Sequence, residues 1–222
     1  DHHVVALDHG TRLHTVAAPE GTLRVDYSAT VALPDPEPSP VSEADRFRYG
    51  LPSRYCPSDR LEGFAVGEFG PVEHEEATVR TVVDWVHRRL TYAPGSTTST
   101  DDALAPLLTG RGVCRDYAHL VVTLFRALGM PARYVSVYAP GLSPMDAHAV
   151  VEVAVDGLWR VVDATRLAPR RSMVRTATGR DATDAAIITS LGGLVQPPWF
   201  EVTATADPDL PDEDPHELLA LA

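Results

Sequence analysis

The stretch GVCRDYAHLVVTLFRALGMPAR, residues 112–133, decides the fold expected for this chain. After a break at Gly110–Gly112, apolar side chains recur at helical spacing and predict a helix with a buried face: Tyr117, Ala118, Val121, Val122, Phe125 and Leu128. Gly129 and Pro131 then end the helix in the usual order. Cys114 is therefore expected in the first turn of a helix whose body is buried.

The position of Cys114 favours a reactive thiol. A helix N-terminus offers the positive end of the helix dipole and free backbone N–H groups, and both favour the thiolate. The same N–H groups can form half of an oxyanion hole. The alternative is a small buried cysteine, which is a common fate of this residue. Position alone does not decide between the two.

Two strands are expected after this helix, AHAVVEVAV (147–155) and LWRVVDA (158–164). Asp156-Gly157 lies between them and is a strong signal for a two-residue hairpin loop. That loop fixes the register and makes His148 and Asp163 diagonal neighbours, about 7–8 Å apart at the backbone. An imidazole–carboxylate hydrogen bond can form over this distance.

Cys114, His148 and Asp163 together form a complete nucleophilic constellation. The thiolate is the nucleophile, the histidine accepts and returns its proton, and the aspartate orients the histidine. Taken singly, His148 can be a hydrogen-bonded sheet histidine and Asp163 a strand-end cap. Both alternatives weaken because the two residues share one face of the predicted sheet.

At these residues the chain resembles bacterial transglutaminase-like proteins. The similarity covers roughly residues 45–205 and rests on four blocks in order: GVCRDYAHL (112–120), RALGMPAR (126–133), AHA (147–149) and WRVVDAT (159–165). A further segment, GRDATD (179–184), is similar to one in predicted cysteine proteases of this family.

The resemblance implies a papain-like cysteine-proteinase fold, with the family's Cys, His and Asp at Cys114, His148 and Asp163. It also implies thioester chemistry without a cofactor, in which Cys114 attacks an amide carbonyl and His148 protonates the departing amine. Water or another amine then resolves the acyl-enzyme. We expect a peptidase or amidase, rather than a crosslinking enzyme, acting on a peptide or protein. The alternative is a catalytically silent module that binds a peptide or partner protein.

The oxyanion donor is left open by the sequence. Papain-like enzymes supply a side chain upstream of the cysteine, often Gln, and no Gln precedes Cys114 here. The candidates are Tyr92, Trp85, a hydroxyl from residues 96–100 or a second backbone N–H. Arg115 and Asp116, in the first turn, are expected either to orient substrate or to cap the helix.

Composition narrows the classes of function further. All 19 basic residues are Arg, so Schiff-base enzymes, Ser–Lys dyads and phosphate-loop lysines are excluded. Asn is absent, which excludes a Cys–His–Asn triad, and Gln196 is the single Gln. The net charge of −12 argues against nucleic acid or an anionic membrane as partner. Two cysteines form no disulfide framework.

Metal and membrane sites are also not expected. A zinc site of Cys114, His119 and His148 lacks a closely spaced ligand pair. No apolar run approaches 18 residues and no signal-peptide pattern opens the chain, so we expect a cytoplasmic enzyme. The chain begins with Asp rather than Met, which leaves upstream residues possible. The oligomeric state stays open.

The expected architecture is α+β, with the Cys114 helix packed on an antiparallel sheet. Residues 1–40 form a small β-rich extension and a Pro-rich linker, residues 41–205 the catalytic domain, and residues 206–222 an acidic tail that is mobile or docks a partner. The remaining expected elements are strands at 4–7, 13–17, 22–33, 132–138 and 199–205, and helices at 71–90, 101–109 and 181–192.

Overall fold

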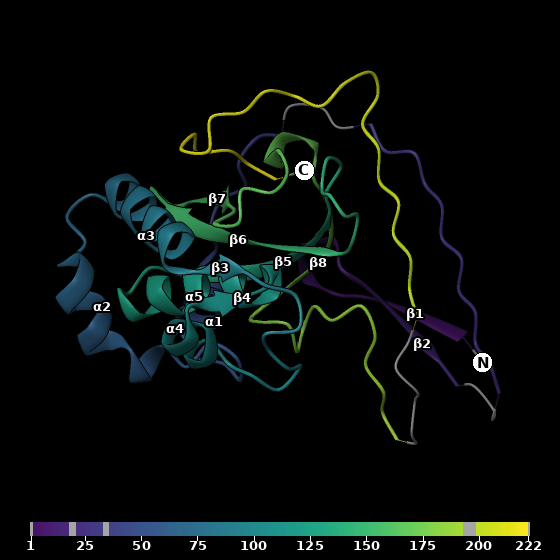
Figure 1. Ribbon diagram of the computed structural model, residues 1–222, viewed down its shortest axis with the longest axis horizontal. Helices are drawn as coiled ribbons and strands as arrows, with labels where there is room; N and C mark the ends of the chain where they lie inside the picture. The colour runs from purple at the N-terminus through teal and green to yellow at the C-terminus, as the bar shows by residue number, and fades with distance from the viewer. Residues whose placement is uncertain (1, 18–20, 33–35, 193–198, 222) are drawn as a thin grey trace.

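The computed structural model describes residues 2–17, 21–32, 36–192 and 199–221. Its centre is a four-stranded antiparallel sheet in the order β7-β6-β5-β8. Helices α3 and α5 cover one face of this sheet, with α5 against β5 and β6 and with α3 beside α5 (Figure 1), and α1 packs on the other face, where Tyr49 contacts Trp159. The α+β architecture expected from the sequence is confirmed.

The elements have the following bounds. The helices are α1 (Glu43–Gly50), α2 (Glu62–Phe69), α3 (Glu75–Arg89), α4 (Leu104–Thr109) and α5 (Cys114–Ala127). The strands are β1 (His2–Ala6), β2 (Arg12–Val16), β3 (Thr91–Tyr92), β4 (Arg111–Gly112), β5 (Ala132–Tyr138), β6 (His148–Val155), β7 (Leu158–Val162) and β8 (Val174–Gly179). Short 3-10 turns lie at Asp8–Gly10, Ser58–Arg60 and Arg170–Ser172.

The α5 helix begins at Cys114 and is buried along most of its length, as the sequence predicts. Its apolar face packs against buried side chains of α3 and β6, among them Val82 and Val151. Gly129 has a φ of +78° and follows the end of the helix, a conformation that glycine adopts without steric cost. The core therefore holds the start of α5 against the sheet.

The β6–β7 hairpin has the predicted register. Val155 pairs with Leu158 and Val151 pairs with Val162. Asp156 and Gly157 have φ values of 50° and 76°, the two positive values that a type I′ turn requires. This register brings Asp163, the residue after β7, opposite Val150, so that it is a diagonal neighbour of His148 at the start of β6.

Several expected elements are absent. Residues 21–32 pair with no strand among the described residues, and Val25 and Tyr27 are 76% and 75% exposed. The alternating pattern there fits a pleated strand, but a strand needs a neighbour to pair its N–H and C=O groups. Residues 199–205 likewise form no strand, and residues 181–192 form turns and irregular chain. Residue 33 of the predicted strand and residues 34–35 of the Pro-rich linker lie outside the described residues.

The turns around Asp181 explain why no helix forms there. The Asp181 carboxylate accepts hydrogen bonds from the backbone N–H groups of Thr183, at 2.8 Å, and Tyr55, at 3.0 Å. An aspartate that bonds to the backbone two residues ahead favours a turn over a helix. The sequence patterns did not predict α1, α2 or β8.

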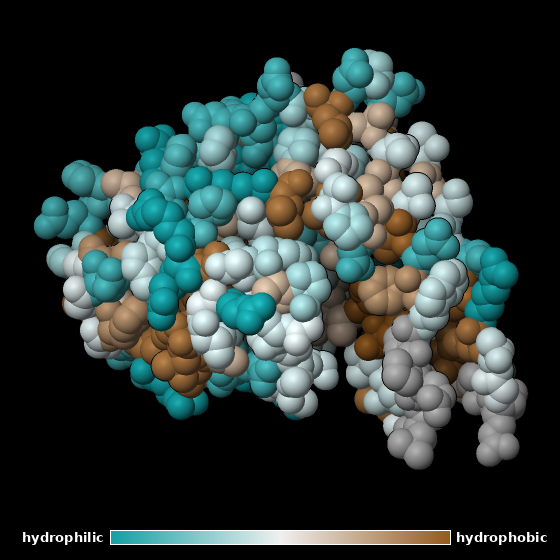
Figure 2. Space-filling view, viewed as in Figure 1, coloured by the Kyte–Doolittle hydropathy of each residue, from teal (hydrophilic) through white to brown (hydrophobic). Residues whose placement is uncertain are grey.

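The N-terminal hairpin β1–β2 extends away from the sheet (Figure 1) and is anchored at its turn. His9 in this turn receives a hydrogen bond from Arg133 of β5, at 3.0 Å, and contacts Asp45 of α1, also at 3.0 Å. Arg133 in turn forms a buried ion pair with Glu152 at 2.7 Å. Figure 2 shows apolar residues on the surface of this region, and the side chains of Val4 and Leu13 in the hairpin are exposed.

The acidic C-terminal end packs on the body. Val161 of β7 donates a backbone hydrogen bond to Leu219 at 2.8 Å, and the side chains of Leu219 and Leu221 are buried. Glu213 pairs with Arg170 at 2.5 Å. The expectation of a tail away from the core is therefore wrong for residues 213–221, where two leucines cover the sheet face opposite α3 and α5. Within the described ranges, no helix has the length and apolar character needed to cross a bilayer.

Candidate active site

Cys114 lies at the N-terminus of α5, where the first backbone N–H groups of a helix have no acceptor within the helix. Its thiol is half-buried, and Sγ is 3.8 Å from the carbonyl oxygen of Ala147, the residue before β6. The reactive end of the helix thus meets the start of the strand that carries His148.

His148 and Asp163 form a buried pair. Nε2 of His148 is 2.8 Å from Oδ2 of Asp163, and both side chains are almost completely excluded from solvent. Because the ionised carboxylate only accepts, Nε2 carries the hydrogen. Nδ1 of the same ring is buried and has no hydrogen-bond partner among the described residues by the usual distance and angle criteria.

The thiol of Cys114 lies on the open side of this ring. Burial alone would lower the pKa of His148, but the charge and hydrogen bond of Asp163 and the adjacent Cys114 thiol raise it to about 10. The imidazolium form is therefore stabilised between a carboxylate and a sulfur. This is the charge arrangement that a thiolate–imidazolium pair requires.

Asp163 is held by its own neighbours. Oδ1 accepts hydrogen bonds from the backbone N–H of Thr165, at 2.8 Å, and from its hydroxyl, at 2.7 Å. Burial alone would raise the pKa of Asp163, but His148 and the two donors of Thr165 lower it below its usual value. The carboxylate stays ionised with one oxygen committed to each partner.

Thr165 belongs to the WRVVDAT block (159–165), on which the family resemblance rests, but the sequence analysis assigned it no role. The signal that identifies it is a hydroxyl residue two positions after an aspartate, a common local hydrogen-bonding pattern.

Thr165→Val is expected to slow Cys114-dependent acylation about tenfold and to lower stability by about 2 kcal/mol, because a hydrogen bond to a charged group is lost while volume is kept. An NMR titration of His148 should show a changed pKa, which a purely structural defect elsewhere would not produce. Thr165→Ser keeps the hydroxyl and should restore the titration. An unchanged titration in Thr165→Val would contradict this role.

Tyr92 stands out among the candidate oxyanion donors. It lies on β3, which pairs with β4 so that Tyr92 is level with Gly112, two residues before Cys114. Burial, and then the Cys114 thiol, raise the pKa of Tyr92 to about 12, while a hydrogen bond from the Cys114 N–H acts in the opposite direction. The Tyr92 hydroxyl is thus beside both the thiol and the backbone N–H of Cys114.

Most of the other oxyanion candidates are engaged elsewhere, although the buried Ser96 hydroxyl has no hydrogen-bond partner among the described residues. The Trp85 indole donates to Glu68 at 2.8 Å, between α3 and α2. The Thr97 hydroxyl donates to Asp116 at 2.6 Å, and the Thr98 hydroxyl bonds with that of Thr100.

Arg115 and Asp116 have structural partners on every side. The Arg115 guanidinium donates to the backbone carbonyls of residues 98, 99 and 101, and it stacks 4.7 Å from the ring of Tyr55. The buried Asp116 carboxylate accepts from the N–H of Val113 at 2.8 Å, so it caps α5. A Cβ on Gly112 would lie 2.7 Å from that of Asp116, so glycine is required there. Of the two roles left open by the sequence, the contacts favour capping and loop anchoring.

His119 is turned away from the cysteine. It is fully buried between the rings of Tyr55 and Tyr134, and Nε2 accepts the N–H of Ala182 at 3.1 Å. Burial lowers the pKa of His119 to about 3, so it stays neutral. In the part of the chain that the structure describes, no group of three or more His, Cys, Asp or Glu side chains could hold a metal ion.

Comparisons with known proteins point to one family. Residues 64–164, which include all three triad candidates, match the Transglutaminase-like superfamily. The uncharacterized protein ML0607 of Mycobacterium leprae is 31% identical over 192 residues, which cover 76% of this chain and 67% of that protein. The uncharacterized protein Rv2569c of Mycobacterium tuberculosis is 29% identical over 47% of this chain and 33% of its own length.

Among solved structures, a candidate cysteine protease from Cytophaga hutchinsonii is similar with a TM-score of 0.64 and 39% identity, over 72% of this chain and 61% of that one. The chain thus spans about two thirds or less of these relatives. The matches fit a cysteine-dependent enzyme and confirm the fold expected from the sequence. On the sequence match and the shared fold, the chain belongs to the transglutaminase-like superfamily.

Proposed function

We propose that the chain is a cysteine-dependent acyl-transfer enzyme that acts on amide bonds of a peptide or protein. The observation that carries this proposal is the buried His148–Asp163 pair, 2.8 Å long, whose second ring nitrogen is open toward the thiol at the start of α5. Hydrolysis is the favoured outcome, which makes the enzyme a peptidase or amidase.

In the proposed reaction, the Cys114 thiolate attacks the amide carbonyl carbon and the carbon–oxygen π electrons move to oxygen. The N–H of Cys114 and the Tyr92 hydroxyl donate to this oxyanion. When the intermediate collapses, the carbon–nitrogen bond breaks and Nδ1–H of His148 protonates the leaving amine. A thioester on Cys114 remains, together with a neutral imidazole.

Deacylation follows the same path in reverse. Nδ1 of His148 takes a proton from water, or from a second amine, as that nucleophile attacks the thioester. The carbon–sulfur bond then breaks and returns the thiolate and the imidazolium. Asp163 remains ionised throughout and holds the ring so that Nδ1 faces the sulfur.

The test is direct acylation of the full chain by p-nitrophenyl acetate, followed by intact mass and peptide mapping. An acetyl group on Cys114 that turns over in water supports the proposal. A chain in which Cys114 stays unmodified, and reacts with iodoacetamide no faster than a free thiol, would instead favour the silent binding module.

Tyr92→Phe is expected to lower the rate of Cys114 acylation about 100-fold, because one of two oxyanion donors is lost. Alkylation by iodoacetamide forms no oxyanion, so its rate should change by less than about threefold in the same variant. Parallel measurement of the two rates separates the proposed role from damage to the thiol. Equal losses in both reactions would contradict it.

A further inference from the structure

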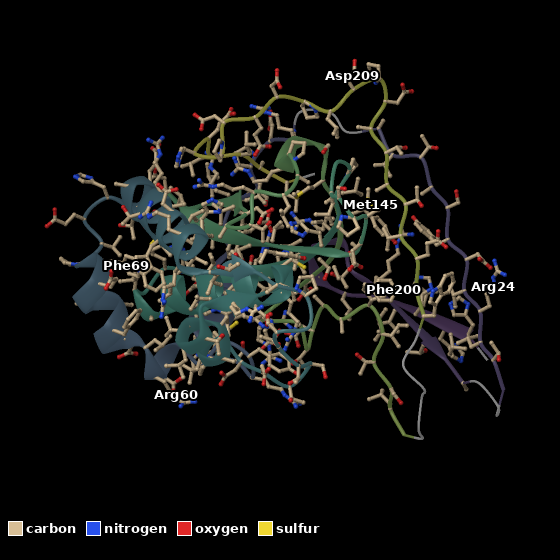
Figure 3. The ribbon with its side chains drawn as sticks, viewed as in Figure 1. Arg24, Arg60, Phe69, Met145, Phe200 and Asp209 are labelled. Carbon is tan, nitrogen blue, oxygen red and sulfur yellow. The ribbon has the colours of Figure 1, made fainter. Side chains whose placement is uncertain are left out.

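Asp146 lies beside the candidate active site. It lies on the connection between β5 and β6, two residues before His148; Figure 3 labels Met145, its chain neighbour. The next residue, Ala147, places its carbonyl oxygen 3.8 Å from Sγ of Cys114. The sequence analysis gave Asp146 no role.

The Asp146 carboxylate is folded onto this same peptide. Oδ1 accepts the N–H of Ala147 at 2.7 Å. Ordinary backbone dimensions then put a carboxylate oxygen within about 10 Å of the Cys114 sulfur. This is about one Debye length at 0.1 M salt, so the charge acts on a molecule bound at the thiol.

The charge is exposed, and no cation among the described residues forms an ion pair with it. Arg115, the guanidinium nearest to Cys114 in sequence, is committed to the carbonyls of residues 98, 99 and 101. The field of Asp146 also reaches Tyr92, since it adds to the larger effects of burial and Cys114 that raise the pKa of that hydroxyl.

We propose that Asp146 is a specificity-determining residue, which selects substrates that present an ammonium or guanidinium group beside the reacting carbonyl. The proposal rests on the proposed function, because it assigns a preference to the same cysteine site. The cation can belong to the acyl group that Cys114 takes up or to the amine that receives it. In both cases the carboxylate attracts the positive charge and repels an anionic competitor.

Charged methanethiosulfonate reagents test the field without knowledge of the natural substrate. The Cys114 thiolate attacks the divalent sulfur of the reagent and forms a disulfide with it. The bond from this sulfur to the sulfonyl group breaks, and methanesulfinate leaves. The rate constant is measured for a trimethylammonium-ethyl reagent and for a sulfonate-ethyl reagent, and peptide mapping confirms modification at Cys114. We expect Asp146→Asn to lower the cation-to-anion rate ratio about fivefold at low ionic strength.

The matched control is Asp156→Asn, which removes the same charge at the far end of β6. Strand geometry places it about 25 Å from Asp146, and asparagine suits its positive φ of 50°. The ratio should stay at the wild-type value in this variant, and Asp146→Glu should restore it. At 1 M salt the effect of Asp146→Asn should disappear. Equal ratios in Asp146→Asn and Asp156→Asn would overturn the proposal.

The reaction rate of Cys114 with the neutral methyl methanethiosulfonate distinguishes a failure of this proposal from a failure of the proposed function. If Cys114 reacts with it no faster than a free thiol, the proposed function fails while the charge ratio can still be read. If the neutral rate is high and Asp146→Asn leaves the ratio unchanged, the specificity role alone fails.

Two substrate pairs distinguish the sources of the cation. The p-nitrophenyl esters of 6-aminohexanoate and hexanoate differ by a charge on the acyl group, and 1,4-diaminobutane and 1-aminobutane differ by a second ammonium on the acceptor. We expect a preference for the extra charge in one pair, lost in Asp146→Asn and kept in Asp156→Asn. No preference in either pair would overturn the substrate selection.

Discussion

Cys114→Ala is expected to abolish acylation by activated esters and amide turnover, with a loss of about 10⁴-fold or more. The sulfur is the atom that forms the thioester, and no other group in the described site can replace it. His148, Asp163 and Tyr92 would remain in place without a nucleophile to serve. The measurement is the burst of p-nitrophenolate on mixing with ester, together with the intact mass of the chain.

Cys56→Ala is the matched control, since it removes the chain's other thiol. Cys56 is fully buried, and burial raises its pKa to about 12, so it should neither react nor contribute to turnover. Its sulfur donates only a weak hydrogen bond to the His119 carbonyl, at 3.6 Å. Wild-type acylation in Cys56→Ala and none in Cys114→Ala is the expected pair of results. A retained burst in Cys114→Ala would place the nucleophile elsewhere.

Iodoacetamide gives the same comparison without a substrate. One adduct should form rapidly on Cys114 of the native chain, faster than on a free thiol at the same pH, as the proposed function requires. A second adduct, on Cys56, should appear only when the chain unfolds.

The positions of Cys114, His148 and Asp163 could be predicted from the sequence because the helix and the hairpin that carry them follow from local sequence patterns. The helix from Cys114 follows from apolar spacing and the Gly129 stop, and the hairpin register follows from Asp156-Gly157. The hairpin register alone implies that His148 and Asp163 can touch, without knowledge of the tertiary structure. The roles of these residues were inferred from chemistry and resemblance, and they stay proposals until the thiol is tested.

The parts that local patterns missed depend on partners distant in sequence. β8 pairs with β5, some forty residues earlier in the chain, and its mixed composition shows no clear alternation. The acidic C-terminal end packs on the body because Val161 and Arg170 bind it. The composition of this segment does not reveal these contacts. Conversely, residues 21–32 alternate like a strand but find no paired neighbour among the described residues.

The choice among oxyanion donors also needed tertiary contacts. Tyr92, Trp85 and the hydroxyls of residues 96–100 are equally plausible by type, and only packing separates them. The short parallel pairing of β3 with β4 brings Tyr92 level with Gly112, whereas α2 draws Trp85 toward Glu68. A two-residue pairing of this kind leaves almost no periodic signal in the sequence.

Asp163→Asn is expected to lower Cys114-dependent acylation and amide turnover by about 10³–10⁴-fold, although the side chain keeps its size. An amide cannot supply the negative charge that raises the pKa of His148 to about 10. Its NH₂ group also cannot accept from Nε2–H, so the ring is free to turn or to change tautomer. Both effects remove the proton that the leaving amine needs at Nδ1.

The pH dependence gives the sharper readout. In the wild type, the raised pKa keeps His148 protonated through neutral pH, and its proton is lost only as the pH approaches about 10. In Asp163→Asn, burial acts with less opposition, so the NMR titration of His148 and the alkaline limb of amide turnover should both move to lower pH. Asp156→Asn, at the opposite end of β6, should leave both unchanged. A His148 titration that stays near its wild-type position in Asp163→Asn would show that the carboxylate does not control the imidazole.

Because Thr165 holds only Oδ1, Thr165→Val should shift the same titration in the same direction by a smaller amount, which orders the two variants along one hydrogen-bonded chain.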